Sequence, residues 1–318
     1  MNVTASTRPS VLVVWPNRPK AMAEIDAAYR LVHLWQAANA EELIDSDGPE
    51  IRAIVTTGER GASAALIERL PRLEIIACFG VGYDGIDVEA CRARGIRVTN
   101  TPDVLSRDVA DMGLGLILMT LRRMAEADRF VRRGDWIQDT LPLGTCLAGK
   151  KLGIIGLGRI GMELAKRARA VDMIPAYHNR SRRGDVELPY FATPIELARW
   201  ADVLVLACPG GAATHHLVTA EVLEALGPEG WLINIARGSV VDEAALVQAL
   251  ETGRIKGAGL DVFADEPRVP EALLAMENVV LQPHMASATE ETRDAMAALV
   301  VANLAAHFAG RELVTPVA

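Results

Sequence analysis

Residues 151–161 read Lys-Leu-Gly-Ile-Ile-Gly-Leu-Gly-Arg-Ile-Gly. The first five residues form a short apolar run typical of a buried strand, and Gly156, Gly158 and Gly161 follow it with the spacing G-x-G-x-x-G where a helical pattern begins. In that context the first glycine permits a tight turn, the second lets the backbone approach a pyrophosphate, and the third allows the helix to pack closely on the strand. The start of the helix adds free amides and the positive end of the helix dipole. The stretch therefore predicts a dinucleotide-binding unit, with contacts expected from Gly156, Leu157, Gly158, Arg159, Ile160 and Gly161.

The end of the next expected strand, residues 174–178, indicates which dinucleotide is bound. An NAD-dependent protein usually places Asp or Glu about 20 residues after the glycine turn, to bind the ribose hydroxyl. Here the chain continues Asn179-Arg180-Ser181-Arg182-Arg183, with no carboxylate at that point. Guanidinium and hydroxyl donors suit a 2′-phosphate. We therefore expect NADPH to be bound through Asn179, Arg180 and Ser181, with NADH as a weaker alternative.

Short apolar runs alternate with helical patterns along most of the chain. Strands are expected at residues 11–15, 54–57, 75–79, 97–99, 151–155, 174–178, 202–207, 231–235, 257–261 and 279–281. Runs of this length suit strands that are covered on both faces of a parallel sheet, and the intervening helices predict an α/β fold. One long helical stretch is expected from Ser106 to about Arg133, and a final helix from Glu290 to Ala309.

The length of 318 residues suits two domains. If the final helix packs on the first hundred residues, one domain is built from both chain ends. Its expected bounds are residues 1–100 and 286–318, with residues 101–285 inserted as the dinucleotide-binding domain.

The overall charge and the apolar segments exclude several classes of partner. A formal net charge of −8 gives no electrostatic footprint for nucleic acid or an anionic membrane. The most apolar segment, residues 112–121, has half the length that a membrane span needs. Because residues 1–10 lack the features of a signal peptide, we expect a cytoplasmic protein.

The cysteines and the adjacent histidines do not indicate a disulfide framework or a metal site. The four cysteines are far apart and form no CxxC pair, so they are expected to be reduced thiols. His215 and His216 have no acidic or cysteine partner at ligand spacing, and we interpret them as a surface pair.

Three polar residues interrupt apolar sequence where the later strands are expected to end. They are Arg237, Glu266 and His284. Ligands of an open parallel sheet bind at the carboxyl ends of its strands, so all three side chains could converge on the nicotinamide. Each has a structural alternative when taken alone, as a surface arginine or a structural histidine. Their joint occurrence in one cofactor domain favours a catalytic site.

Several segments together carry a resemblance to a known family. They are Phe-Gly-Val-Gly-Tyr-Asp-Gly-Ile-Asp at 79–87, Asn-Thr-Pro-Asp-Val-Leu at 100–105, the glycine turn at 156–161, Asn-Ile-Ala-Arg-Gly at 234–238, Asp-Val-Phe-Ala-Asp-Glu-Pro at 261–267, and Gln-Pro-His at 282–284. Over nearly its whole length the chain resembles the D-isomer-specific 2-hydroxyacid dehydrogenases, and within them the glyoxylate/hydroxypyruvate reductases. The segment 179–181 is similar to that of the NADPH-preferring members. One departure is Ala286, where relatives often have glycine.

The resemblance implies a fold and an assembly. Two Rossmann-like, doubly wound parallel-sheet domains are expected, with the cofactor domain inserted into a flavodoxin-like substrate-binding domain. A homodimer formed through the cofactor domain is expected as well.

The resemblance also implies a reaction and the roles of the three polar residues. Reducing a 2-oxo acid requires a hydride on the carbonyl carbon and a proton on the carbonyl oxygen. His284 is expected to donate the proton, because imidazole titrates near working pH, and Glu266 to orient the ring and favour its charged form. Arg237 is expected to hold the carboxylate and polarise the carbonyl. We therefore expect NADPH-dependent reduction of a small 2-oxo acid, of the glyoxylate or hydroxypyruvate type, to the D-2-hydroxy acid.

Further contacts follow from the resemblance. For the substrate they involve the turn with Val81 and Gly82, Tyr83 as a pocket wall, Arg237 and His284. Trp136 has two interpretations: it reaches the active site of a partner subunit, or it packs in the dimer interface. The remaining contacts expected with the cofactor are Pro209, Thr214, Ile235, Ala236, Asp261 and Ser287.

Other functions stay open. Within the family, the chain could reduce 2-ketogluconate or an aryl-pyruvate. If the chain is not an enzyme, it could be a dinucleotide-sensing binding protein like the transcriptional corepressors, which share this fold and keep the three polar residues. Turnover of NADPH with a 2-oxo acid separates an enzyme from a binding protein.

Overall fold

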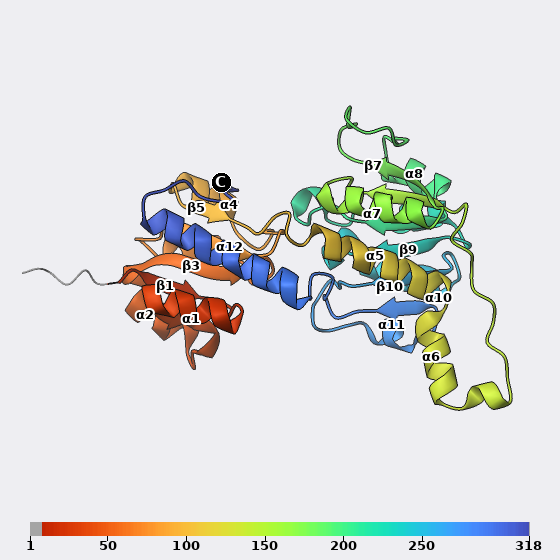
Figure 1. Ribbon diagram of the computed structural model, residues 1–318, viewed down its shortest axis with the longest axis horizontal. Coiled ribbons are helices and arrows are strands. Elements are labelled where there is room, and N and C mark those ends of the chain that lie inside the picture. Colours follow the sequence, from red (N-terminus) through yellow and green to blue (C-terminus); the bar gives the residue numbers. More distant parts are fainter. Residues whose placement is uncertain (1–7, 318) are drawn as a thin grey trace, which may run out of the picture. The chain divides into compact units, whose positions relative to one another are not determined.

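The computed structural model describes residues 8–317 of the chain. Within it the chain divides into two compact units (Figure 1). Unit 1 contains the described residues up to Leu105 and those from Ala288 onward, and unit 2 contains Ser106–Ser287. These boundaries lie a few residues beyond the expected ones at residues 100 and 285. The first seven residues, on which the expected location partly depends, lie outside the described range.

Unit 1 is built on one parallel sheet. Its strands are β1 (Ser10–Val13), β2 (Arg30–His33), β3 (Ile51–Thr57), β4 (Ile75–Phe79) and β5 (Arg97–Thr99), in the order β2-β1-β3-β4-β5. Every neighbouring pair is parallel. This is the strand order of flavodoxin-like domains, as expected from the family resemblance. The helices are α1 (Pro19–Ala28), α2 (Ala40–Asp47), α3 (Ala64–Glu68), α4 (Val88–Ala93) and α12 (Glu290–Phe308), with short 3-10 turns η1 (Leu34–Gln36) and η2 (Gly48–Glu50).

The strands of unit 1 bury alternate residues on opposite faces of the sheet. Val55 and Ile75 face a core completed by Ile25 of α1 and by Leu304 of α12, while Ile54 on the other side joins a second core. This alternation follows from the two-residue period of a strand. The final helix therefore packs on strands from the first hundred residues, which is the condition under which one unit is built from both ends of the chain.

Unit 2 is also built on a parallel sheet. Its strands are β6 (Lys151–Ile155), β7 (Ile174–His178), β8 (Val203–Leu206), β9 (Trp231–Asn234), β10 (Gly257–Leu260) and β11 (Val279–Leu281), in the order β11-β10-β9-β8-β6-β7. All neighbours are parallel. The helices are α5 (Ser106–Leu121), α6 (Met124–Arg132), α7 (Arg159–Ala170), α8 (Pro194–Trp200), α9 (Ala220–Leu226), α10 (Glu243–Glu251) and α11 (Glu271–Ala275), with 3-10 turns η3 (Asp135–Ile137), η4 (Ala212–Thr214) and η5 (Gly238–Val240).

Helices cover both faces of the unit 2 sheet. Helices α5 and α7 lie against each other on one face (Figure 1). Helix α9 contacts both α8 and α10, and all three pack on the core at the other face. The chain order changes direction between the neighbouring strands β6 and β8. Ligands of doubly wound sheets bind at such a switch point, outside the carboxyl ends of the strands. Across the described residues, no helix is both long and apolar enough to span a bilayer.

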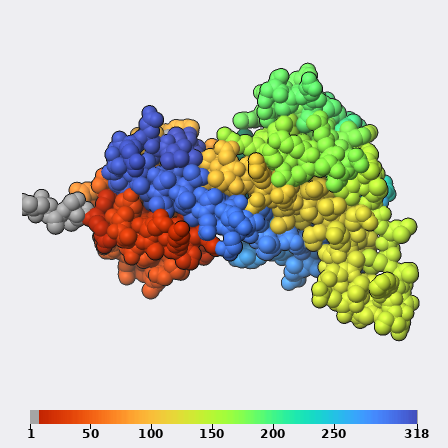
Figure 2. All heavy atoms as spheres, in the orientation of Figure 1, coloured from red at the N-terminus to blue at the C-terminus, as the bar shows by residue number. Residues whose placement is uncertain are grey.

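The long helix expected over residues 106–133 is in fact two helices, α5 and α6. The chain breaks at Arg123, whose φ of +54° lies in the left-handed region. The carbonyl of Leu121 at the end of α5 accepts a hydrogen bond from the amide of Thr145 at 2.7 Å, so a distant segment terminates the helix. Helix α6 and η3 then project from unit 2 (Figures 1 and 2).

Candidate active site

The glycine turn between β6 and α7 lies at the switch point of the unit 2 sheet. Gly156 has a φ of +99°, and a Cβ placed on it would lie 2.4 Å from the backbone nitrogen of Cys208, which follows β8. A Cβ on Gly161 would lie 2.3 Å from the carbonyl oxygen of Gly156. Packing therefore requires glycine at both positions.

Gly158 differs from the other two glycines of the turn. No described heavy atom lies within 4 Å of where its Cβ would be. The missing side chain leaves open space directly before α7, which begins at Arg159. A pyrophosphate could approach the free amides there, so the turn fits a dinucleotide.

The segment after β7 presents cationic and hydroxyl groups. The side chains of Arg180, Ser181 and Arg182 are exposed, and Asn179 is half-buried. Across the described residues, no hydrogen bond or ion pair engages the guanidinium of Arg180 or Arg182. Arg183, in contrast, forms an ion pair with Asp185. The first two guanidinium groups are therefore available to a 2′-phosphate, whereas the third already has a carboxylate partner.

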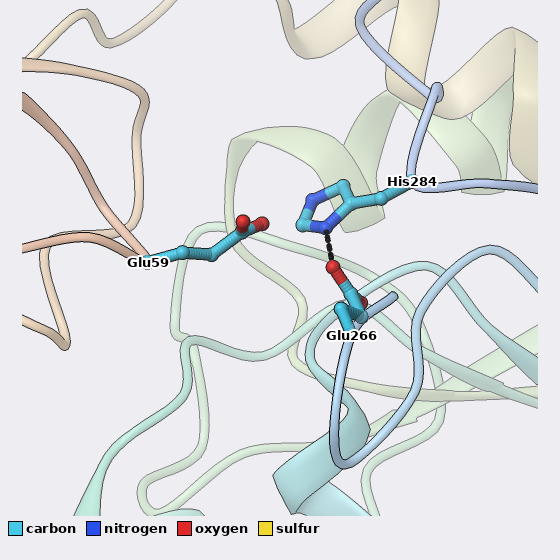
Figure 3. Close-up of side chains that lie close together, drawn as sticks. All are labelled: Glu59, Glu266 and His284. Carbon is cyan, nitrogen blue, oxygen red and sulfur yellow. Dashed lines mark hydrogen bonds and ion pairs between the residues drawn. The ribbon is translucent and has the colours of Figure 1, made fainter. Parts of the chain in front are cut away.

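His284 and Glu266 form a hydrogen-bonded pair beyond the carboxyl ends of β11 and β10. The Nδ1 atom of His284 lies 2.7 Å from Oε2 of Glu266 (Figure 3). The other carboxylate oxygen, Oε1, accepts a hydrogen bond from the amide of Phe263 at 2.9 Å. Both side chains are half-buried. The carboxylate engages Nδ1, so a proton exchanged with a ligand would pass through the other ring nitrogen, Nε2.

Asp261 fixes the backbone that carries His284. His284 has a φ of +50°, and holding a non-glycine residue in the left-handed region costs about 1–3 kcal/mol. Its amide donates to the carbonyl of Asp261 at 2.8 Å, and the Asp261 carboxylate accepts from the amides of Met285 at 2.8 Å and Ala286 at 3.0 Å. Asp261 is buried, and that burial raises the pKa of its carboxyl. Asp261 was predicted to be a cofactor contact. In the structure its carboxylate also positions the loop that carries His284.

We expect Asp261→Asn to lower kcat at least about tenfold, equivalent to about 1.4 kcal/mol. The amide keeps one acceptor oxygen but turns an NH2 group toward a backbone amide, so the loop of His284 loses one of its holds. Steady-state turnover measures the effect. Asp242→Asn is the matched control, because Asp242 caps α10 by accepting from the amide of Ala245 and asparagine caps equally well. Equal kcat values in the two variants would contradict the positioning role.

A buried asparagine shapes the turn of Arg237. The Oδ1 atom of Asn234 accepts from the amide of Ala236 at 3.0 Å, and its Nδ2 donates to the carbonyl of Arg237 at 3.0 Å. Sequence reasoning missed this role, although a single polar residue at the end of the apolar strand β9 signals it. A Cβ on Gly238 would lie 1.9 Å from the carbonyl carbon of Phe263. The turn that carries Arg237 thus packs directly against the turn of Phe263, whose amide donates to Glu266. Arg237, Glu266 and His284 therefore all lie at the carboxyl edge of the unit 2 sheet.

In unit 1, the turn after β4 offers backbone donors. The carbonyl of Val81 accepts from Nδ2 of Asn100 at 2.9 Å, and the amide of Gly80 donates to Oγ1 of Thr101 at 3.1 Å. In the described part of the chain, no group accepts a hydrogen bond from the amides of Val81 or Gly82. Two neighbouring free amides suit a carboxylate. Tyr83 beside them is exposed.

The other predicted cofactor contacts are spread over the ends of β8, β9 and β11. The hydroxyl of Thr214 donates to the carbonyl of Pro209 at 2.7 Å and so closes the loop after β8. Ile235 and Ala236 are buried after β9, and Ser287 is half-buried at the end of unit 2.

Comparison with known proteins gives a consistent result. The family described as "D-isomer specific 2-hydroxyacid dehydrogenase, NAD binding domain" matches residues 114–286. Glyoxylate/hydroxypyruvate reductase A of Arabidopsis thaliana is 50% identical over 307 residues, covering 96% of this chain and 98% of that protein. Hydroxyphenylpyruvate reductase of Plectranthus scutellarioides is 49% identical with the same coverage.

A solved structure is also similar. The NADPH-dependent glyoxylate/hydroxypyruvate reductase of Sinorhizobium meliloti, crystallised with NADP and malonate, is 46% identical with a TM-score of 0.93, covering 98% of this chain and 97% of that one. The glycine turn, the paired histidine and glutamate, and these similarities together lead to one conclusion: the chain belongs to the D-isomer-specific 2-hydroxyacid dehydrogenases, a family of oxidoreductases.

Proposed function

We propose that the protein reduces a small 2-oxo acid, of the glyoxylate or hydroxypyruvate type, to the D-2-hydroxy acid, and that it prefers NADPH. The observation that carries the proposal is the His284–Glu266 pair, held at 2.7 Å at the carboxyl edge of the sheet that also carries the glycine turn. A general acid and a dinucleotide turn at one sheet edge are what carbonyl reduction requires.

The residues of unit 2 supply the acid and the anion-binding group. The bound cofactor supplies the hydride. His284 donates a proton from Nε2 to the carbonyl oxygen, and Glu266 stabilises the imidazolium that precedes the transfer. Arg237 holds the substrate carboxylate and polarises the carbonyl with its planar guanidinium.

The preference for NADPH rests on the segment after β7. Arg180 and Arg182 are exposed cations, and position 179 holds an amide where an NAD-dependent protein usually has a carboxylate. A 2′-phosphate gains from the guanidinium groups and meets no opposing charge at position 179. The NADP complex of the S. meliloti reductase, similar over nearly the whole chain, supports this assignment.

A panel of 2-oxo acids tests whether the protein prefers small or large substrates. Glyoxylate, hydroxypyruvate, 2-ketogluconate and hydroxyphenylpyruvate are compared by kcat/KM at a fixed concentration of NADPH. We expect the two small acids to have the largest values. A higher kcat/KM for hydroxyphenylpyruvate would instead indicate an aryl-pyruvate reductase, like the hydroxyphenylpyruvate reductase of P. scutellarioides to which the chain is similar. Binding of NADPH without turnover of any acid would instead support a dinucleotide-sensing protein.

We also propose a homodimer formed through the cofactor domain. The segment from α6 onward exposes apolar side chains, among them Trp136 (70% exposed), Ile137 (87%) and Leu143 (97%). Exposed apolar side chains gathered in one segment are typical of association surfaces. The segment projects from unit 2, where a second subunit can reach it (Figure 2).

Replacing both Ile137 and Leu143 with glutamate is expected to convert the dimer to monomer, because the interface would have to bury two charges. Sedimentation or light scattering measures the mass. Leu274→Glu is the matched control, since Leu274 is an exposed leucine on α11, outside this segment. A wild-type mass of one chain, or a dimer that persists in the double variant, would contradict the proposal.

Replacement of Trp136 with alanine distinguishes the two interpretations of this residue, namely contact with the partner subunit's active site and packing in the dimer interface. If Trp136→Ala stays dimeric but loses kcat/KM for small acids, the side chain acts at the partner subunit's active site. If the variant dissociates and keeps its kcat/KM, Trp136 packs only in the interface.

A further inference from the structure

The backbone of Leu157 is held from both sides by the segment after β7. Leu157 lies in the glycine turn between Gly156 and Gly158, and its side chain is buried. Its amide donates to Oδ1 of Asn179 at 2.7 Å. Its carbonyl accepts from Nη1 of Arg183 at 2.9 Å. Two side chains of the segment that follows β7 therefore fix the peptide groups in the middle of the pyrophosphate turn.

Arg183 is itself fixed in this position. Its Nε donates to Oδ1 of Asp185 at 2.9 Å, and its Nη2 pairs with the other oxygen of the same carboxylate. Its backbone amide donates at 2.8 Å to the hydroxyl of Tyr177, a fully buried residue of β7. The hydrogen bond with Arg183 lowers the pKa of Asp185, so this carboxylate stays charged over the working range. Nε and Nη2 of Arg183 therefore pair with the Asp185 carboxylate, while Nη1 donates to the carbonyl of Leu157.

The neighbouring arginines have no such fixation. Arg180 and Arg182 are exposed and, among the described residues, lack a hydrogen-bond or ion-pair partner. A free guanidinium can turn to a phosphate, whereas Arg183 would have to give up a carboxylate and a carbonyl to do so. The three arginines, alike in sequence, therefore differ in what they can bind.

We infer that Asn179 and Arg183 are positioning residues of the pyrophosphate turn, which act equally on NADPH and NADH, whereas Arg180, with Ser181 beside it, selects the 2′-phosphate. The inference rests on the proposed preference for NADPH and assigns two different roles to the residues that follow β7. It predicts that affinity for the dinucleotide and choice of the 2′-phosphate can be changed separately.

The first test compares Arg183→Met with Arg180→Met. Dissociation constants of NADP+ and NAD+ are measured by titration calorimetry at a temperature where circular dichroism shows each variant folded. Arg183→Met is expected to weaken both dinucleotides by the same factor, about three- to tenfold, because one hydrogen bond to the turn is lost. Arg180→Met is expected to weaken NADP+ alone. Arg183→Lys should recover much of the loss, since lysine can donate to the carbonyl of Leu157.

The second test uses a pair of substitutions at Asn179. Asn179→Asp keeps an acceptor for the amide of Leu157 and adds the carboxylate that a ribose hydroxyl prefers, so it should weaken NADP+ and leave NAD+ binding intact or tighter. Asn179→Ala removes the acceptor and should weaken both dinucleotides alike.

The results distinguish failure of the inference from failure of the proposed preference. If Arg183→Met weakens NADP+ far more than NAD+, Arg183 is a phosphate ligand and the inference is wrong. If Arg183→Met changes neither constant, the contacts with Leu157 do not position the turn, and the inference is again wrong. If the native protein binds NAD+ as tightly as NADP+ and Arg180→Met alters neither, the NADPH preference fails, while an equal loss in Arg183→Met still supports the two positioning contacts.

Discussion

Replacing His284 with alanine is expected to lower kcat by roughly 10²–10⁴, the range for loss of a general acid. The alanine variant has no group to protonate the developing alkoxide, and water must take that task without the orientation that Glu266 gives the imidazole. Because the Asp261 carboxylate accepts from the amides of Met285 and Ala286 and not from the histidine ring, the backbone of the loop should keep its position. The loss should therefore appear in kcat, with the dissociation constant of NADPH little changed.

The chain offers a matched control for this prediction. His307 also pairs with a carboxylate, its Nε2 lying 2.9 Å from Oε2 of Glu74 in unit 1. His307→Ala removes a similar histidine–carboxylate contact and should leave kcat unchanged. Glu266→Gln should reduce kcat by less than His284→Ala, because the acid remains but its charged form loses support. Near-normal turnover in His284→Ala would show that another group donates the proton.

Gly238→Ala is expected to reduce kcat/KM by about 10²-fold, through displacement of Arg237. The added Cβ would lie 1.9 Å from the carbonyl carbon and 2.0 Å from the carbonyl oxygen of Phe263, so one of the two turns must move by about an ångström or more. One turn carries Arg237 and the other supplies the amide that holds Glu266. Misplacement of catalytic groups by about this distance costs rate on the order of a hundredfold.

Gly184→Ala is the control for the glycine substitution. No described heavy atom lies within 4 Å of a Cβ at Gly184, so this variant should keep the native kcat/KM. Binding of NADP+ by both variants, measured by calorimetry, shows that the dinucleotide unit is intact. If Gly238→Ala binds NADP+ and keeps full kcat/KM, the contact between the two turns does not align the catalytic groups.

Much of the fold could be predicted because the strands are buried on both faces. Strands of a sheet covered on both sides read as continuous apolar runs, and these runs locate the strands of unit 2 to within one or two residues. Strand β2 was missed, because it is an edge strand of four residues, Arg-Leu-Val-His, that begins with an exposed arginine. The break between α5 and α6 was missed because Thr145, far along the chain, caps Leu121.

The residues of the site were easier to predict than their contacts. Parallel strands carry their carboxyl ends to one edge, so Arg237, Glu266 and His284, which follow β9, β10 and β11, were expected to lie near one another. The positioning by Asn234 and Asp261 could not be read from the sequence, because it depends on which backbone amides the turns direct at each side chain. The same holds for Arg183, whose carbonyl partner lies 26 residues earlier in the chain.

The most direct test of the proposed function follows NADPH and product together, with hydroxypyruvate as substrate because its reduced product is chiral. The loss of reduced-nicotinamide absorbance is compared with the amount of hydroxy acid formed and with its handedness, in the native protein and in His284→Ala. We predict one D-hydroxy acid for each NADPH consumed, and loss of both signals together in the variant. Binding of NADPH without consumption, or formation of the L-isomer, would contradict the assignment.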